Sequence, residues 1–410
     1  MSFFDFPAAG RREFLGSLGG GAAFSASSQT TERAKPLSIG LIGCGGRGSH
    51  LARRTLAVKA DGFPVELTAV CDVYQPRLER ASVAFSAKPY ASSSEMLRDA
   101  PLDGVIVATP DRVHVHKALE AVRAGKDVYC EKPLTHWMQF SLLKELVVEA
   151  RRQKTVFQVG AQWVSDPIWT QAAAQIRKGA IGKVIHAQTG YFRRGDSGER
   201  GMPIDDPNAQ AGRGLDWDAF QADAPRRDFN VSRFFQWRMY LDYSGGPITD
   251  LYPHPLTRLL KAIGAGMPSR VVSVGGRFLY DGGRDVPDTA DLLIEYPDGP
   301  TVSVLGTIGN SSPIDTVIRG SDGTVTFDQS NGLVFASMPG AKGANSTLDS
   351  QRYEDNHLRN WMECMRSRKT PVCDIELGYV VQVPLIMAMR SLIERKVAVW
   401  DASNEEIRMV

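Results

Sequence analysis

Residues 37–48 read Leu-Ser-Ile-Gly-Leu-Ile-Gly-Cys-Gly-Gly-Arg-Gly, a short apolar run that ends in the pattern G-x-G-x-x-G. The run predicts a buried β-strand, and the stretch from Ser49 to Lys59 predicts a helix directly after it. In such a unit the first glycine permits a tight turn, the second lets the backbone approach a pyrophosphate, and the third lets the helix pack on the strand. The helix N-terminus then faces the anion. The candidate residues of this dinucleotide-binding loop are Gly43, Gly45, Gly46, Arg47 and Gly48.

Strands and helices continue to alternate after this loop. Short apolar runs that predict buried strands are separated by helical stretches, one of which places Val115, Leu119 and Val122 on one face and closes at Gly125. This order predicts an α/β fold with a doubly wound parallel sheet of six strands. The further strands are expected at 65–71, 104–108, 127–130 and 155–159.

Asp72 follows the second predicted strand, where a carboxylate accepts hydrogen bonds from a ribose diol. A carboxylate at this place repels a 2′-phosphate and binds a free 2′-hydroxyl, so we expect NAD as the cofactor. Arg77 is close enough in sequence to accommodate a phosphate if Asp72 turns away. NADP therefore stays an alternative.

The whole chain has 410 residues, more than one hydrophobic core usually serves, so two domains are expected. A net charge of +2, without a basic stretch interleaved with aromatic residues, gives no reason to expect nucleic acid. The five cysteines form no C-x-x-C pair and no cluster with histidine, so no metal site is expected. A Cys364–Cys373 disulfide stays an open alternative. Small molecules are the expected partners.

The first 35 residues are interpreted as a signal and linker. Arg11-Arg12 precedes a weakly apolar run rich in Gly and Ala over residues 16–26, which resembles a twin-arginine export signal. This predicts a periplasmic or otherwise exported protein, and the alternative is a disordered tail on a cytoplasmic one. No later run is expected to span a membrane, which needs about 18 apolar residues, because residues 380–389 are few and are interrupted by Pro384.

The pattern changes after Gly160 to extended segments that alternate apolar and polar residues and are separated by Gly, Asp and Pro turns. They predict a second, α+β domain with a large and mostly antiparallel open sheet. One face of such a sheet needs cover, so a homo-oligomer interface is expected. We place the nucleotide-binding domain at 36–160 and the second domain at 161–400. Its strands are expected at 184–192, 270–280, 290–296, 301–308, 315–318 and 324–327.

Two further motifs resemble the glucose-fructose oxidoreductase / inositol dehydrogenase (Gfo/Idh/MocA) family: Thr109-Pro110 with His114, and Glu131-Lys132-Pro133 within residues 128–134. The resemblance covers essentially the whole chain after the N-terminal segment. It implies a Rossmann domain, a second domain with a large open sheet, oligomers, and NAD(P)-dependent chemistry on sugars, cyclitols or related polyols. It also implies cofactor-lining roles for Thr109, Pro110 and His114, and places Glu131 and Lys132 near the nicotinamide.

Oxidation of a carbinol requires a base that takes the hydroxyl proton. His254 has a suitable side chain, with an ordinary pKa of about 6.5, and Lys132 can polarise the oxygen or relay the proton. The family's D-x-x-x-H motif implies that Asp250 orients the imidazole of His254. Pro253 and Pro255 flank this histidine and disfavour a regular helix around it.

Aromatic faces beside hydrogen-bonding groups suit a sugar ring. Residues 215–218 and 233–246 resemble exported members of the family, some of which are NAD-dependent glycoside hydrolases. The chain has no Gly-Gly-His-Gly-Gly segment, so a redox-neutral hydrolase or isomerase is the second hypothesis after a sugar or polyol oxidoreductase. A non-catalytic carbohydrate-binding protein is the third. The substrate-binding candidates are Trp163, Trp237, Arg238 and Tyr243.

Overall fold

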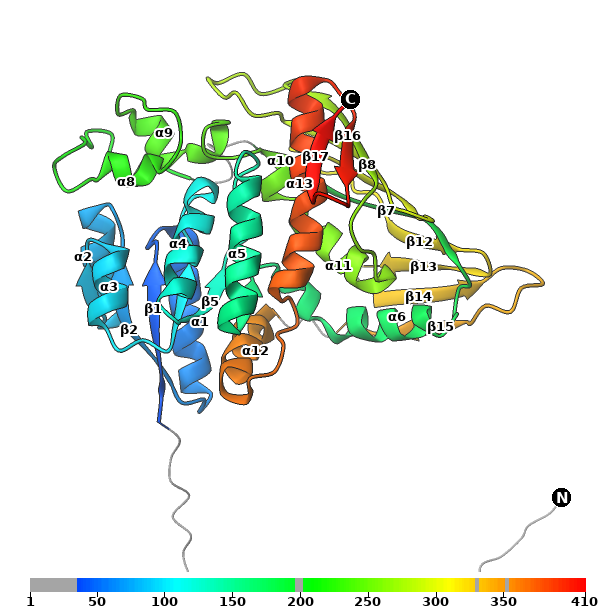
Figure 1. The fold of residues 1–410 in the computed structure, drawn as a ribbon, viewed down its shortest axis with the longest axis horizontal. Coiled ribbons are helices and arrows are strands. Elements are labelled where there is room, and N and C mark those ends of the chain that lie inside the picture. Colours follow the sequence, from blue (N-terminus) through cyan, green and yellow to red (C-terminus); the bar gives the residue numbers. More distant parts are fainter. Residues whose placement is uncertain (1–34, 196–201, 329–331, 351–353) are drawn as a thin grey trace, which may run out of the picture. The chain divides into compact units, whose positions relative to one another are not determined.

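The computed structural model describes residues 35–195, 202–328, 332–350 and 354–410 (Figure 1). The candidate export signal at Arg11-Arg12 lies outside these residues. Residues 36–410 form one compact unit.

The first part of this unit is the predicted parallel sheet of six strands, in the order β3-β2-β1-β4-β5-β6. The chain therefore adds strands on one side of β1 and then returns to add β4 on the other side, which makes a topological switch point where ligands of such sheets bind. Sequence reasoning did not locate β3, because it has only three residues and two of them are exposed. The strands are β1 (Leu37–Ile42), β2 (Val65–Cys71), β3 (Lys88–Tyr90), β4 (Gly104–Val107), β5 (Asp127–Cys130) and β6 (Phe157–Val159).

Five helices connect these strands and cover the sheet. The predicted helix that closes at Gly125 is α4, which buries Val115, Leu119 and Val122 on one face as expected. It ends at Arg123, before Gly125, whose φ of +70° suits glycine. The helices are α1 (Gly46–Ala60), α2 (Gln75–Phe85), α3 (Ser93–Asp99), α4 (Asp111–Arg123) and α5 (Phe140–Gln153).

One element from far along the chain packs on this first sheet. Helix α12 (Glu354–Ser367) places Trp361 in the same core as Ile39 of β1 and Ile106 of β4. The indole of Trp361 is fully buried and donates a hydrogen bond to the carbonyl oxygen of Val156 at 3.1 Å. Residues 354–367 thus complete the core of the nucleotide-binding part, although they follow the boundary predicted at residue 160.

The second sheet has eleven described strands in the order β15-β14-β13-β12-β7-β10-β9-β8-β16-β17, with β11 paired to β7. Its described pairs are antiparallel except for β7 and β10, which are parallel. All six predicted strands are present, while β11 and β14–β17 were not predicted. The β16–β17 hairpin continues past the predicted end at residue 400. The strands are β7 (Val184–Arg194), β8 (Arg270–Gly276), β9 (Thr289–Glu295), β10 (Thr301–Thr307), β11 (Gly309–Asn310), β12 (Thr316–Gly320), β13 (Gly323–Asp328), β14 (Gly332–Ser337), β15 (Ser346–Leu348), β16 (Ala398–Asp401) and β17 (Glu406–Met409).

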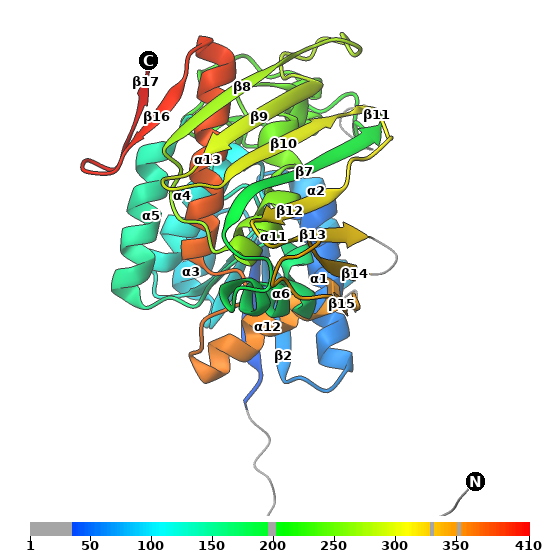
Figure 2. The same ribbon diagram turned by 90° about the vertical axis from the view of Figure 1, so that its right-hand side faces the viewer.

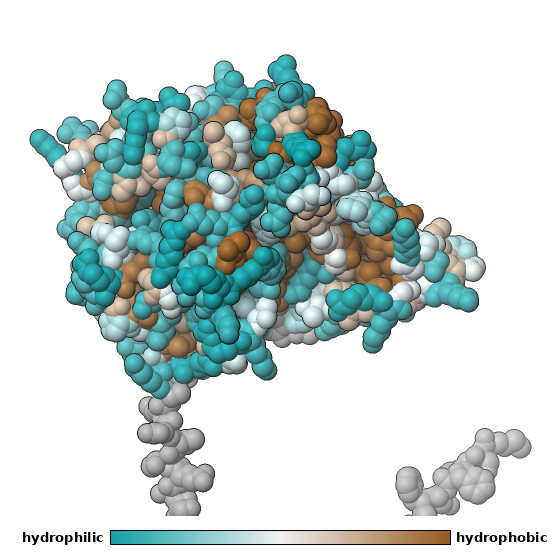
Figure 3. Space-filling view, viewed as in Figure 1, coloured by the Kyte–Doolittle hydropathy of each residue, from teal (hydrophilic) through white to brown (hydrophobic). Residues whose placement is uncertain are grey.

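Helices lie behind one face of this sheet, as Figure 2 shows for α6 (Pro167–Arg177), α11 (Pro253–Ile263) and α13 (Ile375–Glu394). The opposite face carries exposed apolar side chains on β8, β9 and β14. Hydrophobic residues gather over the right-hand side of Figure 3, where the strands of this sheet lie. The outward apolar residues are Val274, Leu293 and Val334.

Helix α13 is the one described helix that is long and apolar enough to cross a membrane. Its most apolar window is 72% buried inside the protein, as expected of a core helix in a folded domain. The expectation that Pro384 interrupts this apolar run is wrong, because the helix continues through that residue. The prolyl ring is itself buried.

Residues 202–243, here called the 202–243 segment, contain the short elements α8 (Trp217–Gln221), α9 (Val231–Phe235) and η2 (Trp237–Met239). The segment has its own aromatic core, which includes Tyr74 of the first part. In Figure 1 its light-green helices lie beside α2 and α4 of the first part. The segment therefore links the two sheets at the end where the parallel strands terminate.

The remaining sequence expectations concern cysteines and metals. All five cysteines are buried and free, so the Cys364–Cys373 disulfide is not formed. In the part of the chain that the structure describes, no group of three or more His, Cys, Asp or Glu side chains is placed to hold a metal ion.

Candidate active site

A cleft of about 880 Å³ lies at the carboxyl ends of the parallel strands and reaches toward the second sheet. This volume is within the range of small-molecule sites. The cleft brings together most of the predicted cofactor and catalytic residues. The predicted residues that line it are Gly43, Gly45, Gly46, Arg47, Asp72, Thr109, Pro110, His114, Glu131, Lys132, Trp237, Arg238, Asp250 and His254.

The glycine loop has the close contacts that the pattern predicts. Gly43 has a φ of +94°, and a Cβ there would lie 2.6 Å from the carbonyl oxygen of Ala108. A Cβ on Gly48 would lie 1.8 Å from the carbonyl oxygen of Gly43. Gly46, by contrast, begins α1 and faces space with no atom within 4 Å of a Cβ. The open space before the helix N-terminus fits a pyrophosphate.

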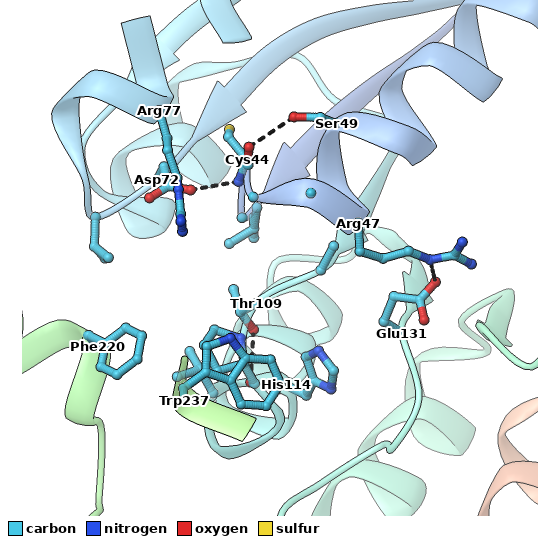
Figure 4. A pocket seen from close by; sticks show the side chains of 18 of the residues that line it. Cys44, Arg47, Ser49, Asp72, Arg77, Thr109, His114, Glu131, Phe220 and Trp237 are labelled. Atoms are coloured by element: carbon cyan, nitrogen blue, oxygen red, sulfur yellow. Dashed lines mark hydrogen bonds and ion pairs between the residues drawn. The ribbon is translucent and has the colours of Figure 1, made fainter. Parts of the chain in front are cut away.

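Asp72 braces this loop from the end of β2. Its Oδ2 accepts a hydrogen bond from the backbone N–H of Cys44 at 2.6 Å, drawn in Figure 4, and its Oδ1 accepts from Tyr74 N at 2.9 Å. Burial raises the pKa of this carboxyl, while Arg77 opposes the rise. Each carboxylate oxygen has a second acceptor position, which is what a ribose diol needs.

Arg77, the residue that could accommodate a 2′-phosphate, is held by another carboxylate. Its Nε donates to Asp205 Oδ2 at 2.9 Å. Two carboxylates, those of Asp72 and Asp205, therefore lie at this end of the cleft. The charge of Asp205 is matched by Arg77 and by Arg80, whose Nη2 lies 3.6 Å from it, so the preference for NAD rests on Asp72.

The Glu131-Lys132-Pro133 turn is fixed on both sides. The carboxylate of Glu131 accepts a hydrogen bond from Arg47 Nε at 2.6 Å (Figure 4), and a Cβ on Gly160 would lie 2.7 Å from that carboxyl group. His114 Nδ1 donates to the carbonyl oxygen of Pro133 at 2.6 Å. Burial lowers the pKa of His114 to about 4, so the ring is neutral at neutral pH. His114 thus anchors the turn that carries the lysine.

Lys132 reaches from this turn to the second part. Its Nζ donates to Asp250 Oδ1 at 2.7 Å and to the carbonyl oxygen of Asp250 at 2.6 Å. Arg238 Nε donates to the same Oδ1 at 3.1 Å. Burial alone would raise the pKa of Asp250, but the charges of Lys132 and Arg238 hold it well below its usual value. Asp250 is therefore an anion that anchors two cations.

The expected pairing of Asp250 with His254 is not what the structure contains. Helix α10 (Pro247–Asp250) ends at the aspartate, and α11 begins only at Pro253. The two side chains therefore do not lie at i and i+4 of one helix face. The break falls at Leu251–Tyr252, before Pro253, which takes the first turn of α11, and the carboxylate of Asp250 pairs with Lys132 instead. The expectation that the prolines disfavour a helix around His254 is wrong, because α11 includes His254 and runs through Pro255.

His254 lines the cleft with an uncharged ring. Burial, and after it the charge of Lys132, hold the pKa of His254 well below its ordinary value. Its Nδ1 is buried and has no hydrogen-bond partner among the described residues. The ring of Trp163 lies 4.7 Å from the imidazole, centroid to centroid, and also stacks on Tyr191. Trp163 is not among the cleft-lining residues, so it supports His254 from behind.

Of the other predicted substrate residues, two line the cleft and one does not. Trp237 and Arg238 line the cleft, and the guanidinium of Arg238 lies 4.2 Å from the Trp237 ring centroid. Tyr243 is fully buried in the aromatic core, 5.3 Å from the ring of Phe220. Its assignment to the substrate site is therefore wrong, because its ring packs in the aromatic core and not in the cleft.

Sequence reasoning missed two residues that line the cleft, and one buried carboxyl close to Asp250 and Lys132. Tyr191 and Arg193 project from β7 into the cleft. Arg193 is buried on the inward-facing side of β7, in phase with Ala187 and Thr189 but one residue past the predicted end of that strand. Its position in phase with the buried residues was a readable signal, since arginine is seldom buried unless it is paired. Asp111 begins α4 beside Thr249 Oγ1 at 3.5 Å, and burial raises its pKa to about 7. Nothing in the local sequence marks this burial.

Comparison with known proteins decides the family. Residues 37–161 match the model of an oxidoreductase family with an NAD-binding Rossmann fold, and residues 218–326 match the GFO/IDH/MocA C-terminal domain. Together these matches span more than half of the chain. The chain belongs to the Gfo/Idh/MocA family. This membership confirms the NAD-binding fold that the glycine loop predicted.

Individual relatives in the family are distant. Inositol 2-dehydrogenase 2 of Saccharopolyspora erythraea is 34% identical over 162 residues, which cover 38% of this chain and 46% of that protein, so the match spans about half of that relative's length. The scyllo-inositol 2-dehydrogenase (NAD(+)) of Bacillus subtilis is 26% identical over 354 residues, 82% of this chain and 89% of that protein.

Solved structures share the fold. A levoglucosan dehydrogenase in complex with NADH has a TM-score of 0.68 at 18% identity, over 92% of this chain and 99% of that chain. The WlbA dehydrogenase of Bordetella pertussis in complex with NADH and UDP-GlcNAcA has a TM-score of 0.66 at 19% identity, over 90% and 99%. The two-part architecture is therefore that of known NADH-bound dehydrogenases.

Replacing Asp72 with Asn should weaken the discrimination between NADH and NADPH. The substitution removes a charge that repels the 2′-phosphate and an acceptor for the ribose hydroxyls, so we expect the preference to fall by about 1–3 kcal/mol. Fluorescence titration with both nucleotides measures it. Asp103→Asn is the matched control, because Asp103 accepts a backbone hydrogen bond from Ser38 at the start of β1. Tighter binding of NADPH than NADH by the unmodified protein would contradict the assignment.

Proposed function

We propose that the protein is an NAD-dependent oxidoreductase that acts on a carbinol of a sugar or polyol. One observation carries the proposal: the neutral imidazole of His254 and the ammonium of Lys132 line the same cleft as the glycine loop and Asp72. A proton acceptor and a hydrogen-bond donor are the two groups that carbinol oxidation asks of the protein.

A bound nicotinamide supplies the hydride acceptor or donor for such a reaction. His254, which is uncharged, accepts the hydroxyl proton in the oxidation direction. Lys132 has three N–H donors and uses two of them on Asp250, so its third can bind the substrate oxygen. Asp250 holds the ammonium in position, and Arg238 holds Asp250.

The substrate class is supported by the cleft and by the relatives. Tyr191 and Trp237 offer aromatic faces, while Arg193 and Arg238 offer hydrogen-bond donors, beside His254. This mixture suits a ring that has apolar faces and a rim of hydroxyl groups. Two of the relatives act on inositols by name, which is the same class of compound.

We also propose that the protein assembles into a homo-oligomer through the open face of the second sheet. Val274 is 62% exposed and Leu293 is 61% exposed on this face. Contiguous exposed apolar side chains on a sheet are typical of an interface. A second copy of the same sheet is the partner that supplies a matching apolar surface.

We further propose that the protein is exported by the twin-arginine route. The support is the sequence of the N-terminal segment, in which Arg11-Arg12 precedes a weakly apolar run. This route carries folded proteins, so NAD can be loaded before the protein crosses the membrane.

Lys132→Met and His254→Ala should each lower kcat by about 10²–10⁴-fold, because each removes a group that handles the proton. The assay is nicotinamide absorbance with a panel of inositols and hexoses, and nucleotide binding is measured in parallel and should persist. Lys183→Met, on the exposed turn before β7, is the control that should keep the wild-type rate.

Rates near that of the wild type in both active-site variants would refute the assigned site. Product formation without any net change in nicotinamide absorbance would instead identify a redox-neutral hydrolase or isomerase. Ligand binding without turnover of any compound would identify a carbohydrate-binding protein on the same fold.

Leu293→Asp should dissociate the oligomer, because assembly through the open sheet face would then bury an unpaired charge. Light scattering coupled to size-exclusion chromatography measures the mass. Val83→Asp is the matched control, since Val83 is 83% exposed on α2 of the first part and should leave the mass unchanged. A monomeric wild-type protein would refute the interface.

Replacing Arg11 and Arg12 together by Lys should retain the protein in the cytoplasm, since the arginine pair is the recognised feature of the signal. Cell fractionation with immunodetection measures this. Arg33→Lys in the same segment is the control and should be exported normally. Cytoplasmic location of the wild-type protein would show that the N-terminal segment is not a signal.

A further inference from the structure

The 202–243 segment forms one wall of the cleft. The proposed roles of Lys132 and His254 in proton transfer do not explain why this wall is there. Several of its residues line the cleft together with Asp72 and Arg77 of the nucleotide-binding part. Figure 4 shows Phe220 and Trp237 across the cavity from Asp72. The segment therefore faces the part of the cleft where Asp72 receives the adenosine ribose. Besides Arg238, its lining residues are Met202, Pro203, Asp205, Asp216, Ala219 and Phe220, with Phe234, Phe235 and Trp237.

The backbone attaches this segment directly to the end of β2. Gln75 N donates to the carbonyl oxygen of Gly214 at 2.7 Å, and Asp216 N donates to the carbonyl oxygen of Val73 at 2.9 Å. These two bonds flank an antiparallel bridge between Tyr74 and Leu215. The attachment begins one residue after the carboxylate that marks the ribose site.

Side chains reinforce the same attachment. Arg77 forms an ion pair with Asp205, and both side chains are more than two-thirds buried. The guanidinium of Arg77 also lies 5.1 Å from the ring centroid of Phe235. Tyr74 meets Phe234 edge to face at 5.5 Å. Ion pairs that are shielded from solvent and packed on aromatic rings hold more strongly than exposed ones.

A second attachment lies on α4. Arg112, whose side chain is 5% exposed, donates from Nε to Asp223 Oδ1 at 2.8 Å and from Nη2 to the Asp223 carbonyl oxygen at 2.8 Å. Gln139 Nε2 donates to the same carboxylate oxygen at 2.7 Å. The segment is thus fastened at two places, to β2 with α2 and to α4 with the turn before α5.

We propose that the 202–243 segment completes the nucleotide site as a cover over the adenosine end of NAD. The cover must detach from β2 and α4 before NAD binds or leaves. The attachments therefore slow both the binding and the release of NAD. This inference rests on the proposed function only through nucleotide binding, and it does not depend on which sugar is oxidised.

The kinetics of NAD exchange test the cover. Protein loaded with radiolabelled NAD is mixed with excess unlabelled NAD for the release rate, and nucleotide-free protein is mixed with NAD for the binding rate. Asp205→Asn and Asp223→Asn each weaken one attachment, so both rates should rise at least about tenfold while Kd changes less than about threefold. An attachment that must open slows both the binding and the release of NAD, whereas a contact made with NAD itself slows its release alone.

Asp218→Asn is the matched control. Asp218 lies on the same segment with its side chain 84% exposed, and it pairs with Arg226 of the same segment rather than with the nucleotide-binding part. Its exchange rates should equal those of the wild type. Circular dichroism verifies that each variant is folded, and Asp205→Asn alone carries the test if Asp223→Asn fails to fold.

Two results would overturn the cover. One is that folded Asp205→Asn and Asp223→Asn proteins exchange NAD at wild-type rates. The other is that NAD release becomes faster in these variants while the binding rate is unchanged. Neither result bears on catalysis, because the assay contains no sugar. Conversely, a protein that shows the expected exchange but oxidises no polyol would refute the proposed function and leave the cover in place.

Discussion

The contact between Lys132 and Asp250 is the interaction on which the site depends, because it joins the two parts of the protein at the place of chemistry. The lysine stands on the turn after β5, and the aspartate ends α10, 118 residues later in the chain. Two donor hydrogen bonds to one residue, through its carboxylate and its carbonyl oxygen, fix the ammonium in distance and direction. Each neighbouring feature then has a defined role: Glu131 and His114 hold the turn, Arg238 holds the carboxylate, and His254 faces the same space.

The electrostatics of this centre follow from burial. His114 and His254 lie away from water, so the pKa of each ring is lowered and both rings are neutral. Both line the cleft, and His114 donates from Nδ1 to the carbonyl oxygen of Pro133. Asp250 stays ionised in similar surroundings because two cations contact it. For Asp111 the effect of burial outweighs the charges of Arg238 and Lys132, and its pKa rises to about 7. Neighbouring carboxyls thus differ in charge because their partners differ.

Local patterns predicted the parts of this protein that depend on neighbours in sequence. Asp72, Glu131, Lys132 and the glycine loop up to Arg47 line the cleft, since each follows its own strand. The partner of Asp250 was not predicted, because the break between α10 and α11 turns the carboxylate toward a lysine from another part of the chain. Tyr243 was misassigned for a related reason: its neighbours in sequence suit a sugar site, while its neighbours in space are a core.

The packing of α12 has a consequence for how the chain is made. The first sheet lacks part of its core until Trp361 and its helix have been synthesised, because Trp361 meets Tyr129 of β5 edge to face and belongs to the same buried cluster as Ile39 and Ile106. During synthesis, the apolar surface of β1 and β4 therefore stays uncovered until nearly two hundred residues after β6 have been made. The nucleotide-binding part precedes the second sheet in the gene, yet it is completed only after most of that sheet exists. Ribosome-bound intermediates of this protein carry an unfinished Rossmann core for most of their lifetime.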